Sequence, residues 1–230
     1  MKKLYALLLS LTVLSACSKD EEGPDLHYPA AFEVKSLRDP SPIRMYTRNG
    51  EVKDKALVNA FADRWGKWYN LDEKSKEAAN SGEVLTLLSR KEAELNNGKR
   101  YDIQKQGDDL LLVSQNEFTG RFSQRDEFYF NLFLGISKYK PVIYDKYPTP
   151  PSGGTVEYIY KSKEQLVAAL TGKELHIYQM AYTLKSGEKL AWSVKGSVFS
   201  NRFDPGVISQ LRSTDTLLVQ EFVMVGEPVK

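Results

Sequence analysis

The feature that most limits the fold of this chain is a two-residue period of apolar side chains, which begins near Glu83 and continues toward the C-terminus. Side chains of a strand point alternately to the two faces of a sheet, so this period is typical of strands with one buried face. The clearest case is residues 189–198, where polar residues alternate with Leu190, Trp192, Val194 and Val198. We therefore expect the chain to be built largely from antiparallel strands.

Turn-forming dipeptides separate these runs at the spacing of hairpins. Glycine beside asparagine or aspartate is typical of two-residue hairpin loops, and such pairs occur at Asn49-Gly50, Asn97-Gly98 and Gly107-Asp108. Ser186-Gly187 has the same role before the run at 190–198. Strands are predicted at residues 43–47, 84–88, 101–104, 110–113, 175–184, 190–198 and 217–225, and also at 128–134 from Phe128, Phe130, Leu132 and Leu134.

One early segment has the period of a helix instead. Asp54 is a typical N-cap residue, and the apolar residues after it form one stripe, which consists of Leu57, Val58, Phe61, Trp65, Trp68 and Tyr69. This spacing predicts an amphipathic helix that packs on the sheet. We expect Trp65 and Trp68 to be core anchors of that helix and not ligand contacts.

Two shorter helices are predicted among the strands. Ser162 with Gln165 matches a capping box, and Gly172 stands where such a helix would end. Asp204-Pro205 offers a cap and a helix-compatible proline before residues 207–211, although a turn fits those residues equally. The predicted fold class is mainly β: an antiparallel barrel or sandwich with an early amphipathic helix and one or two short helices. The alternative class is α+β.

The N-terminus has the charge pattern of a signal peptide. Lys2 and Lys3 precede Leu4–Ala16, a stretch of 13 residues without a charge, whereas a membrane-spanning helix needs about 20 apolar residues. No second stretch of this kind follows in the sequence. We expect residues 1–16 to be a removable signal peptide, residues 17–30 a tether, and residues 31–230 a single globular domain without a membrane span.

The signal peptide ends in Leu14-Ser15-Ala16-Cys17. This tetrapeptide resembles the lipobox of bacterial lipoproteins, in which small residues fit the peptidase and the cysteine is acylated before cleavage. The resemblance implies that Cys17, the only cysteine of the chain, carries diacylglycerol and a further acyl chain such as palmitate. Cys17 would then anchor the domain to a membrane. An ordinary signal peptide cleaved after Ala16 is the alternative.

The residues directly after Cys17 are Ser18-Lys19-Asp20-Glu21-Glu22. A lysine followed by acidic residues at this position is similar to the export tag of surface-exposed lipoproteins of Bacteroidetes. The resemblance implies a lipid anchor in the outer membrane with the domain facing the cell exterior, and the periplasmic face is the alternative. An acidic run is also typical of a solvated tether.

Composition limits the class of partner. Residues 1–16 hold two of the 32 basic residues, so the rest of the chain has 30 basic and 30 acidic residues. Nucleic-acid binding depends on many basic contacts to phosphates, so no nucleic-acid partner is expected. Once Cys17 is acylated no thiol remains, and we expect no cofactor and no zinc, copper or iron site, because such sites need several histidine or cysteine ligands.

Residues that commonly carry catalysis are few. His27 falls in the predicted tether, and His176 falls in the predicted strand 175–184, where a structural role is the favoured interpretation. Neither the serine-hydrolase elbow nor the P-loop motif occurs. Asp108-Asp109 is interpreted as turn chemistry and Asp126-Glu127 as the start of a strand. A glycosidase pair elsewhere stays open, because such pairs are defined by spatial separation.

The most distinctive segment is residues 139–154. It contains Tyr139, Tyr144 and Tyr147, followed by prolines and glycines, and tyrosines beside stiff prolines form amphipathic surface platforms. We take these three tyrosines as the candidate ligand-binding residues, with glycans among the ligands on which such rings stack. The alternative is that residues 142–144 form an edge strand and the rest a connecting loop.

These features favour a membrane-anchored, non-catalytic binding module for a glycan, a small amphipathic ligand or an outer-membrane protein partner. A carboxylate-based hydrolase and a structural or assembly subunit of an envelope complex are the alternatives. A deep cavity lined by tyrosines would favour the binding module, and two carboxyl groups at glycosidase spacing would favour the hydrolase. A large exposed apolar patch would favour the subunit.

Overall fold

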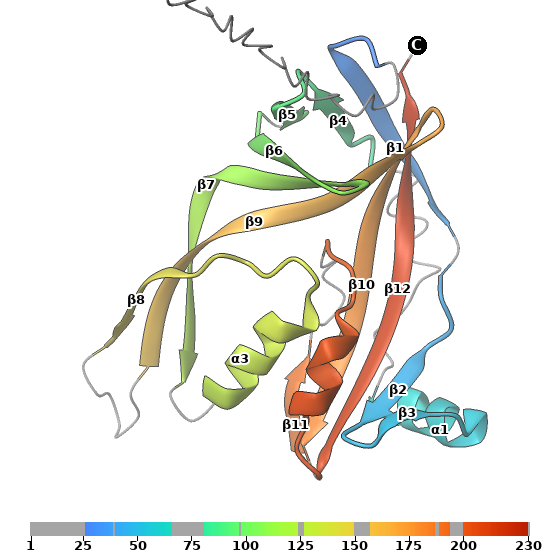
Figure 1. Ribbon diagram of the computed structural model, residues 1–230, viewed down its shortest axis with the longest axis vertical. Helices are drawn as coiled ribbons and strands as arrows, with labels where there is room; N and C mark the ends of the chain where they lie inside the picture. Colours follow the sequence, from blue (N-terminus) through green and yellow to red (C-terminus); the bar gives the residue numbers. More distant parts are fainter. Residues whose placement is uncertain are drawn as a thin grey trace, which may run out of the picture.

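The computed structural model describes residues 26–38, 40–65, 81–96, 98–123, 127–149, 157–186, 189–193 and 200–229. These residues are mainly β and form one twelve-stranded sheet in which every pairing is antiparallel. Eight of the strands close into a ring, because β10 pairs with β9 on one side and with β12 on the other. The predicted mainly β class is confirmed, and the fold is a barrel rather than a sandwich (Figure 1).

The ring is formed in spatial order by β10 (Glu174–Ser186), β9 (Glu157–Thr171), β7 (Asp109–Ser123), β6 (Arg100–Gln106), β5 (Glu92–Leu95), β4 (Val84–Leu87), β1 (Ala30–Arg38) and β12 (Asp215–Pro228). Outside the ring lie β2 (Arg44–Thr47), β3 (Gly50–Val52), β8 (Tyr144–Pro148) and β11 (Lys189–Ser193). The described helices are α1 (Lys55–Trp65), α3 (Glu127–Ile136) and the 3-10 helix η2 (Pro205–Gln210). None of them combines the length and apolarity that a membrane span requires.

The predicted hairpins lie where the turn dipeptides placed them. Gly107 has φ +62° between β6 and β7, and Gly50 has φ +107° where the β2–β3 hairpin turns. Backbone in this left-handed region favours glycine, since a side chain would clash with the main chain. The strands predicted around residues 43–47, 84–88, 101–104, 110–113, 175–184 and 217–225 are confirmed, and β11 confirms 190–198 as far as residue 193.

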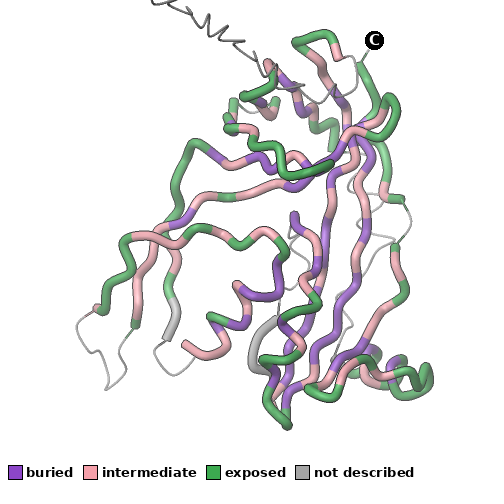
Figure 2. Tube along the Cα trace, viewed as in Figure 1, coloured by how far each residue is buried: buried purple, intermediate pink, exposed green. Residues whose placement is uncertain are grey.

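The upper part of the molecule is a closed barrel with an apolar interior. Alternate residues of its strands point inward, as the two-residue period predicts. The buried members of this core are Phe32, Val34, Leu85, Leu87, Ala93, Tyr101, Leu112, Ala168, Leu175 and Ile177. In Figure 2 the buried residues follow β10 and β12 over most of their length, so these two strands form the spine of the fold.

The lower part is held open by helices. In Figure 1 β7 and β9 run together away from β10 and β12, and α3 lies between the two pairs of strands. α3 and η2 cover the lower halves of β10 and β12, and this second core consists of Tyr46, Leu132, Ile136, Met180, Tyr182, Leu184, Phe203, Val207, Leu211, Leu217 and Val219. The helices thus replace a barrel wall where the strands separate.

The predicted early helix forms as α1. It packs on the face of β12 opposite to the face that α3 and η2 cover. Asp54 accepts hydrogen bonds from the backbone N–H groups of Ala56 and Leu57 at 2.9 and 3.1 Å, which makes it the N-cap. Val58 is buried against β2 and β12. Leu57 is 52% exposed, so its place in the buried stripe is wrong. Trp68 and the Trp65 side chain lie outside the described residues, and their core role stays a prediction.

The strand predicted at 128–134 is wrong: these residues belong to α3. All of them except Asn131 are apolar or aromatic, so both the strand period and the helix period fit the sequence. The helix is wedged between two walls, with Leu132 and Ile136 facing β10 and β12 while Phe130 contacts Tyr160 of β9. A helix buried on two sides lacks the single stripe by which a sequence pattern is recognised.

The helix predicted to begin at Ser162 is also wrong. These residues belong to β9, and Gly172 ends that strand as a hairpin turn instead of ending a helix. The Ser162 hydroxyl donates to the carbonyl of Val142 at 3.1 Å instead of capping a helix. Leu166, Ala168 and Leu170 point into the barrel core as alternate residues of a strand. Their burial outweighs the local preference of Ser162 and Gln165 for a helix start. The η2 prediction at Asp204-Pro205 is confirmed.

Candidate functional site

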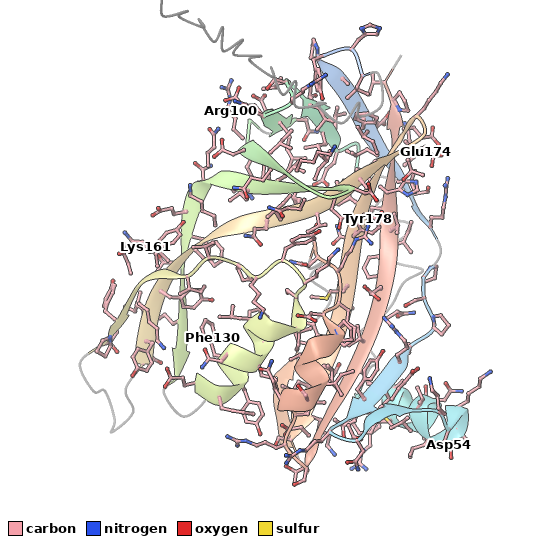
Figure 3. All side chains as sticks on the ribbon, viewed as in Figure 1. Asp54, Arg100, Phe130, Lys161, Glu174 and Tyr178 are labelled. Carbon is pink, nitrogen blue, oxygen red and sulfur yellow. The ribbon has the colours of Figure 1, made fainter. Side chains whose placement is uncertain are left out.

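A single hydroxyl marks the point where β9 and β10 separate. Their ladder runs from the Gly172 turn to the pair Val167–Tyr178 and ends there. At that pair the Oγ of Ser200 accepts a hydrogen bond from the Val167 N–H at 3.0 Å and donates one to the Tyr178 carbonyl at 3.1 Å. The Ser200 hydroxyl therefore stands in place of a direct bond between the two strands. Figure 3 labels Tyr178 on β10 and Lys161 on the departing part of β9.

Below this point lies a cleft of about 300 Å³, at the lower end of the range for small-molecule sites. Its walls come from β7, β9, α3, the segment 200–201 and the connector, by which we mean residues 137–143 between α3 and β8. The lining residues are Phe118, Phe133, Leu134, Pro141, Ile143, Tyr160, Ser162, Lys163, Glu164, Gln165, Leu166, Ser200 and Asn201. Aromatic and aliphatic side chains of this cleft come from α3, the connector and the sheet, whereas the serine, lysine, glutamate, glutamine and asparagine side chains come from β9 and the segment 200–201.

Tyr160 forms an aromatic wall of the cleft because the residue opposite it is a glycine. The two are paired across β7 and β9, and a Cβ on Gly120 would overlap the Tyr160 ring. The ring also contacts Phe130 at a centroid distance of 5.0 Å and Phe118 at 6.4 Å. Burial raises the pKa of Tyr160, so its hydroxyl stays neutral. Glycine at position 120 thus fixes the position of this wall.

Most polar side chains of the cleft already have partners. Ser162 donates to the Val142 carbonyl, and Glu164 forms an ion pair with Lys99. Asn201 accepts from the Tyr139 N–H at 3.1 Å and donates to the Tyr139 carbonyl at 2.8 Å. The Oε1 of Gln165 is different: it is buried and has no hydrogen-bond partner among the described residues. A buried acceptor in this state costs free energy until a donor reaches it.

The connector is fastened to the barrel by a carboxylate, Asp109, at the start of β7. Its side chain is 5% exposed and accepts from Tyr139 Oη at 2.7 Å, Lys138 Nζ at 3.2 Å and Arg202 Nη2 at 2.6 Å. We call these four residues the Asp109 cluster. The Arg202 guanidinium also lies 3.6 Å from the ring centroid of Tyr178. One buried carboxylate thus holds the connector and the 200–203 segment, which form two walls of the cleft.

Burial alone would raise the pKa of Asp109, but hydrogen bonds from Tyr139 and Lys138 and the charge of Arg202 outweigh it, and the pKa lies below the usual 3.8. We expect ionised Asp109 to contribute its full stability above about pH 4, and to lose it as the pH falls through the lowered folded-state value. The measurement is urea unfolding of the wild type and an Asp109→Asn variant against pH. Their difference in unfolding free energy should be largest near neutrality and shrink toward acid pH. A difference that grows toward acid pH would contradict this.

The three candidate tyrosines do not converge on one platform. Tyr139 is part of the Asp109 cluster, Tyr144 begins β8 with its hydroxyl buried, and Tyr147 is 48% exposed farther along β8. None of them lines the cleft, although Pro141 and Ile143 of the same segment do. The edge strand runs over Tyr144–Pro148 rather than 142–144. Residues 150–154 lie outside the described residues, and ligand binding by the tyrosines stays a prediction.

His176 has a carboxylate beside it that the sequence did not reveal. Its Nε2 lies 3.0 Å from Oε2 of Glu174, which also accepts two hydrogen bonds from Arg38 at 2.9 and 3.0 Å. The hydrogen bonds from Arg38 and His176 hold the pKa of Glu174 below its usual value. This group (Glu174 is labelled in Figure 3) ties the β9–β10 hairpin to β1, and none of its three residues lines the cleft. His27 is exposed.

The adjacent carboxylate pairs do not face a common cleft. Asp108 is exposed in the β6–β7 turn, whereas Asp109 points into its own cluster, a role beyond turn chemistry. Glu127 begins α3, not a strand, and pairs with Lys146 at 2.6 Å. Among the described lining residues of the cleft Glu164 is the one carboxylate. The described residues hold no group of three or more histidine, cysteine, aspartate or glutamate side chains arranged for a metal ion.

Sequence reasoning missed most of this site. Gln165 was read as part of a capping box, and Ser200 and Asn201 carry no motif. The one usable signal was the pair of apolar residues Pro141 and Ile143 within the tyrosine-rich segment.

Compared with protein-family models, curated proteins and solved structures, the chain matches none.

Proposed function

We propose that this chain is a lipid-anchored, non-catalytic binding module whose ligand site is the cleft between β9 and α3. Cys17 carries the acyl chains, and the domain faces the exterior of the outer membrane. The ligand is a small amphipathic molecule. The observation that carries the proposal is the cleft itself: it measures about 300 Å³, is walled largely by apolar side chains, and holds one buried acceptor that has no hydrogen-bond partner among the described residues.

The composition of the cleft supports an amphipathic ligand over a sugar. Phe118, Phe133 and Leu134 offer apolar contact from two different elements, and apolar walls with a few polar groups are typical of small-molecule sites. A sugar ring can stack a C–H face on an aromatic side chain, but it carries several hydroxyl groups around its rim, each of which loses water on burial and needs a partner. Most polar side chains lining the cleft already bond to protein groups.

These hydrogen bonds and the ion pair also favour binding over catalysis. Nucleophilic catalysis needs a base that takes the proton of the nucleophile, but the Ser162 hydroxyl donates to a backbone carbonyl and the Ser200 hydroxyl to another. Glycoside hydrolysis needs two carboxyl groups, and Glu164 stands without a second one among the described lining residues. The cleft is therefore better suited to hold a molecule than to transform one.

Filling the cleft should abolish retention of the ligand. Leu134→Trp places a larger side chain in the cleft, whereas Asn131→Trp places the same side chain on the exposed side of the same helix. The three proteins are extracted from membranes, and the small molecules that co-purify are compared by mass spectrometry. We expect at least one molecule retained by the wild type and by Asn131→Trp at similar occupancy and reduced more than about tenfold in Leu134→Trp. The same profile in all three proteins, with or without retained molecules, would contradict the proposal.

A further inference from the structure

The edge of β9 that faces the cleft can be identified from its neighbours. Val167 directs its N–H toward β10, since it donates to the Ser200 hydroxyl inserted between the two strands. Glu157, ten residues earlier, directs its carbonyl to the same edge and accepts from Thr149 beyond β8. Alternate residues of a strand direct their backbone groups to the same edge. Lys163 and Gln165 therefore present their N–H and C=O groups on the edge that β10 has left.

No strand of the described residues lies beside this stretch of edge. The ladder with β10 stops at Val167, and the ladder with β8 starts at Lys161, which pairs with Tyr144. Between these two points Lys163 and Gln165 have no strand partner on that side among the described residues, and both line the cleft. The cleft is thus a gap in the sheet, bounded above by β10 and below by β8.

The gap has the dimensions of a short strand. Lys163 and Gln165 are two residues apart, roughly 6.6 Å along a strand, so an extended ligand residue opposite Lys163 can exchange two backbone hydrogen bonds with it while the neighbouring peptide group of the ligand lies beside Gln165. Unpaired backbone groups that lie in a partly buried site favour such pairing. The buried Oε1 of Gln165 adds an acceptor at the same place.

We infer that the cleft binds a neutral, amide-bearing ligand of dipeptide size, which pairs with the backbone of Lys163 as an added antiparallel strand, reaches Gln165 with its neighbouring peptide group and places an apolar side chain between β9 and α3. This inference rests on the proposed function, because it names the ligand chemistry of the same cleft. Main-chain pairing supplies the affinity in such a complex, and the apolar pocket selects the side chain. Phe133 and Leu134 of α3 form that pocket.

The probe is N-acetyl-leucine N-methylamide, whose leucine N–H and C=O face one edge of an extended chain. It is titrated into the full lipidated chain, and binding is followed by NMR through backbone amide signals. We expect the Lys163 and Gln165 amide signals to move most. The matched ligand control is the ester analogue, in which oxygen replaces the leucine N–H, and we expect it to bind about five- to tenfold more weakly, since one hydrogen-bond donor is lost.

A proline variant removes the protein's own donor. Lys163→Pro deletes an N–H that faces the gap and not the ladder with β7, so the strand should tolerate it as edge strands tolerate proline. Lys163→Ala removes the same side chain and keeps the N–H. We expect about tenfold weaker binding of the probe by Lys163→Pro and binding within about twofold of the wild type by Lys163→Ala. Because the ester comparison uses the wild-type chain, it decides the question even if the proline variant does not fold.

Each outcome has a defined meaning. Equal affinity for amide and ester, or no movement of the Lys163 and Gln165 signals, overturns strand addition. If the Leu134→Trp protein nevertheless loses a co-purifying molecule, the cleft remains a binding site for a ligand of other chemistry. If the co-purification test fails as well, the proposed function fails together with this inference.

Discussion

Replacement of Cys17 with alanine is expected to move the protein almost completely from the membrane fraction to the soluble fraction. Each buried CH₂ of an acyl chain contributes about 0.8 kcal/mol to membrane binding, and two or three chains hold a protein durably where one does not. Cys17 is the only cysteine of the chain, so its loss removes the one residue that the lipobox resemblance assigns to acylation. The measurement is fractionation of cells followed by detection of the protein in each fraction.

Ser18→Ala is the control, since it changes the neighbouring residue and leaves the thiol. We expect this variant to stay in the membrane fraction. Mass spectrometry of the wild-type N-terminus should show diacylglycerol and a further acyl chain on Cys17. A Cys17→Ala protein that remains with the membrane would contradict the lipid anchor.

Replacement of Asp109 with alanine is expected to lower the free energy of unfolding by about 3 kcal/mol, the lower end of the range for breaking a buried ion pair. The carboxylate is buried, whereas Lys138 and Arg202 are partly exposed and can regain some hydration. Its removal also frees the connector and the 200–203 segment from β7. The measurement is urea unfolding near neutral pH followed by circular dichroism.

Asp108→Ala is the matched control, because that neighbouring carboxylate is exposed in the turn. We expect it to change the unfolding free energy by less than about 0.5 kcal/mol, as is usual for surface substitutions. A loss below about 1 kcal/mol for Asp109→Ala would show that the Asp109 cluster does not hold the connector in place.

The strands were predictable where turn chemistry and alternation agree. Gly107-Asp108 between two alternating runs defines a hairpin within a few residues, and β6 and β7 form there. Barrel closure was not predictable, because it depends on β12 pairing with both β1 and β10. Two segments were assigned to the wrong type of secondary structure: Phe128–Leu134 is a helix and Ser162–Gly172 a strand with its turn. Both segments lie beside the cleft, where α3 meets β9. The local sequence of each fits a helix and a strand, so tertiary packing decides between the two.

The cleft itself could not be predicted from local patterns. Asp109 and Arg202 are separated by 93 residues in sequence and meet only because the barrel brings the start of β7 beside the 200–203 segment. The edge at Lys163 and Gln165 leaves no mark in the sequence, since it is defined by the lack of a neighbouring strand among the described residues. The chemistry of the site is therefore a property of the topology more than of any motif.

The position of β12 in the sheet also determines when the barrel can close during folding. β12 is the last strand in the sequence, yet it joins β1, β2 and β10, and its Glu221 bonds to Arg44, 177 residues away. Such non-local contacts are slow to form, roughly milliseconds to seconds. β1 and β2 can pair early with β4 and β3, but the second neighbour of each forms only after β12 has been synthesised. If the chain is exported as we propose, this order would keep the barrel open, and the polypeptide unfolded, until passage through the membrane is complete.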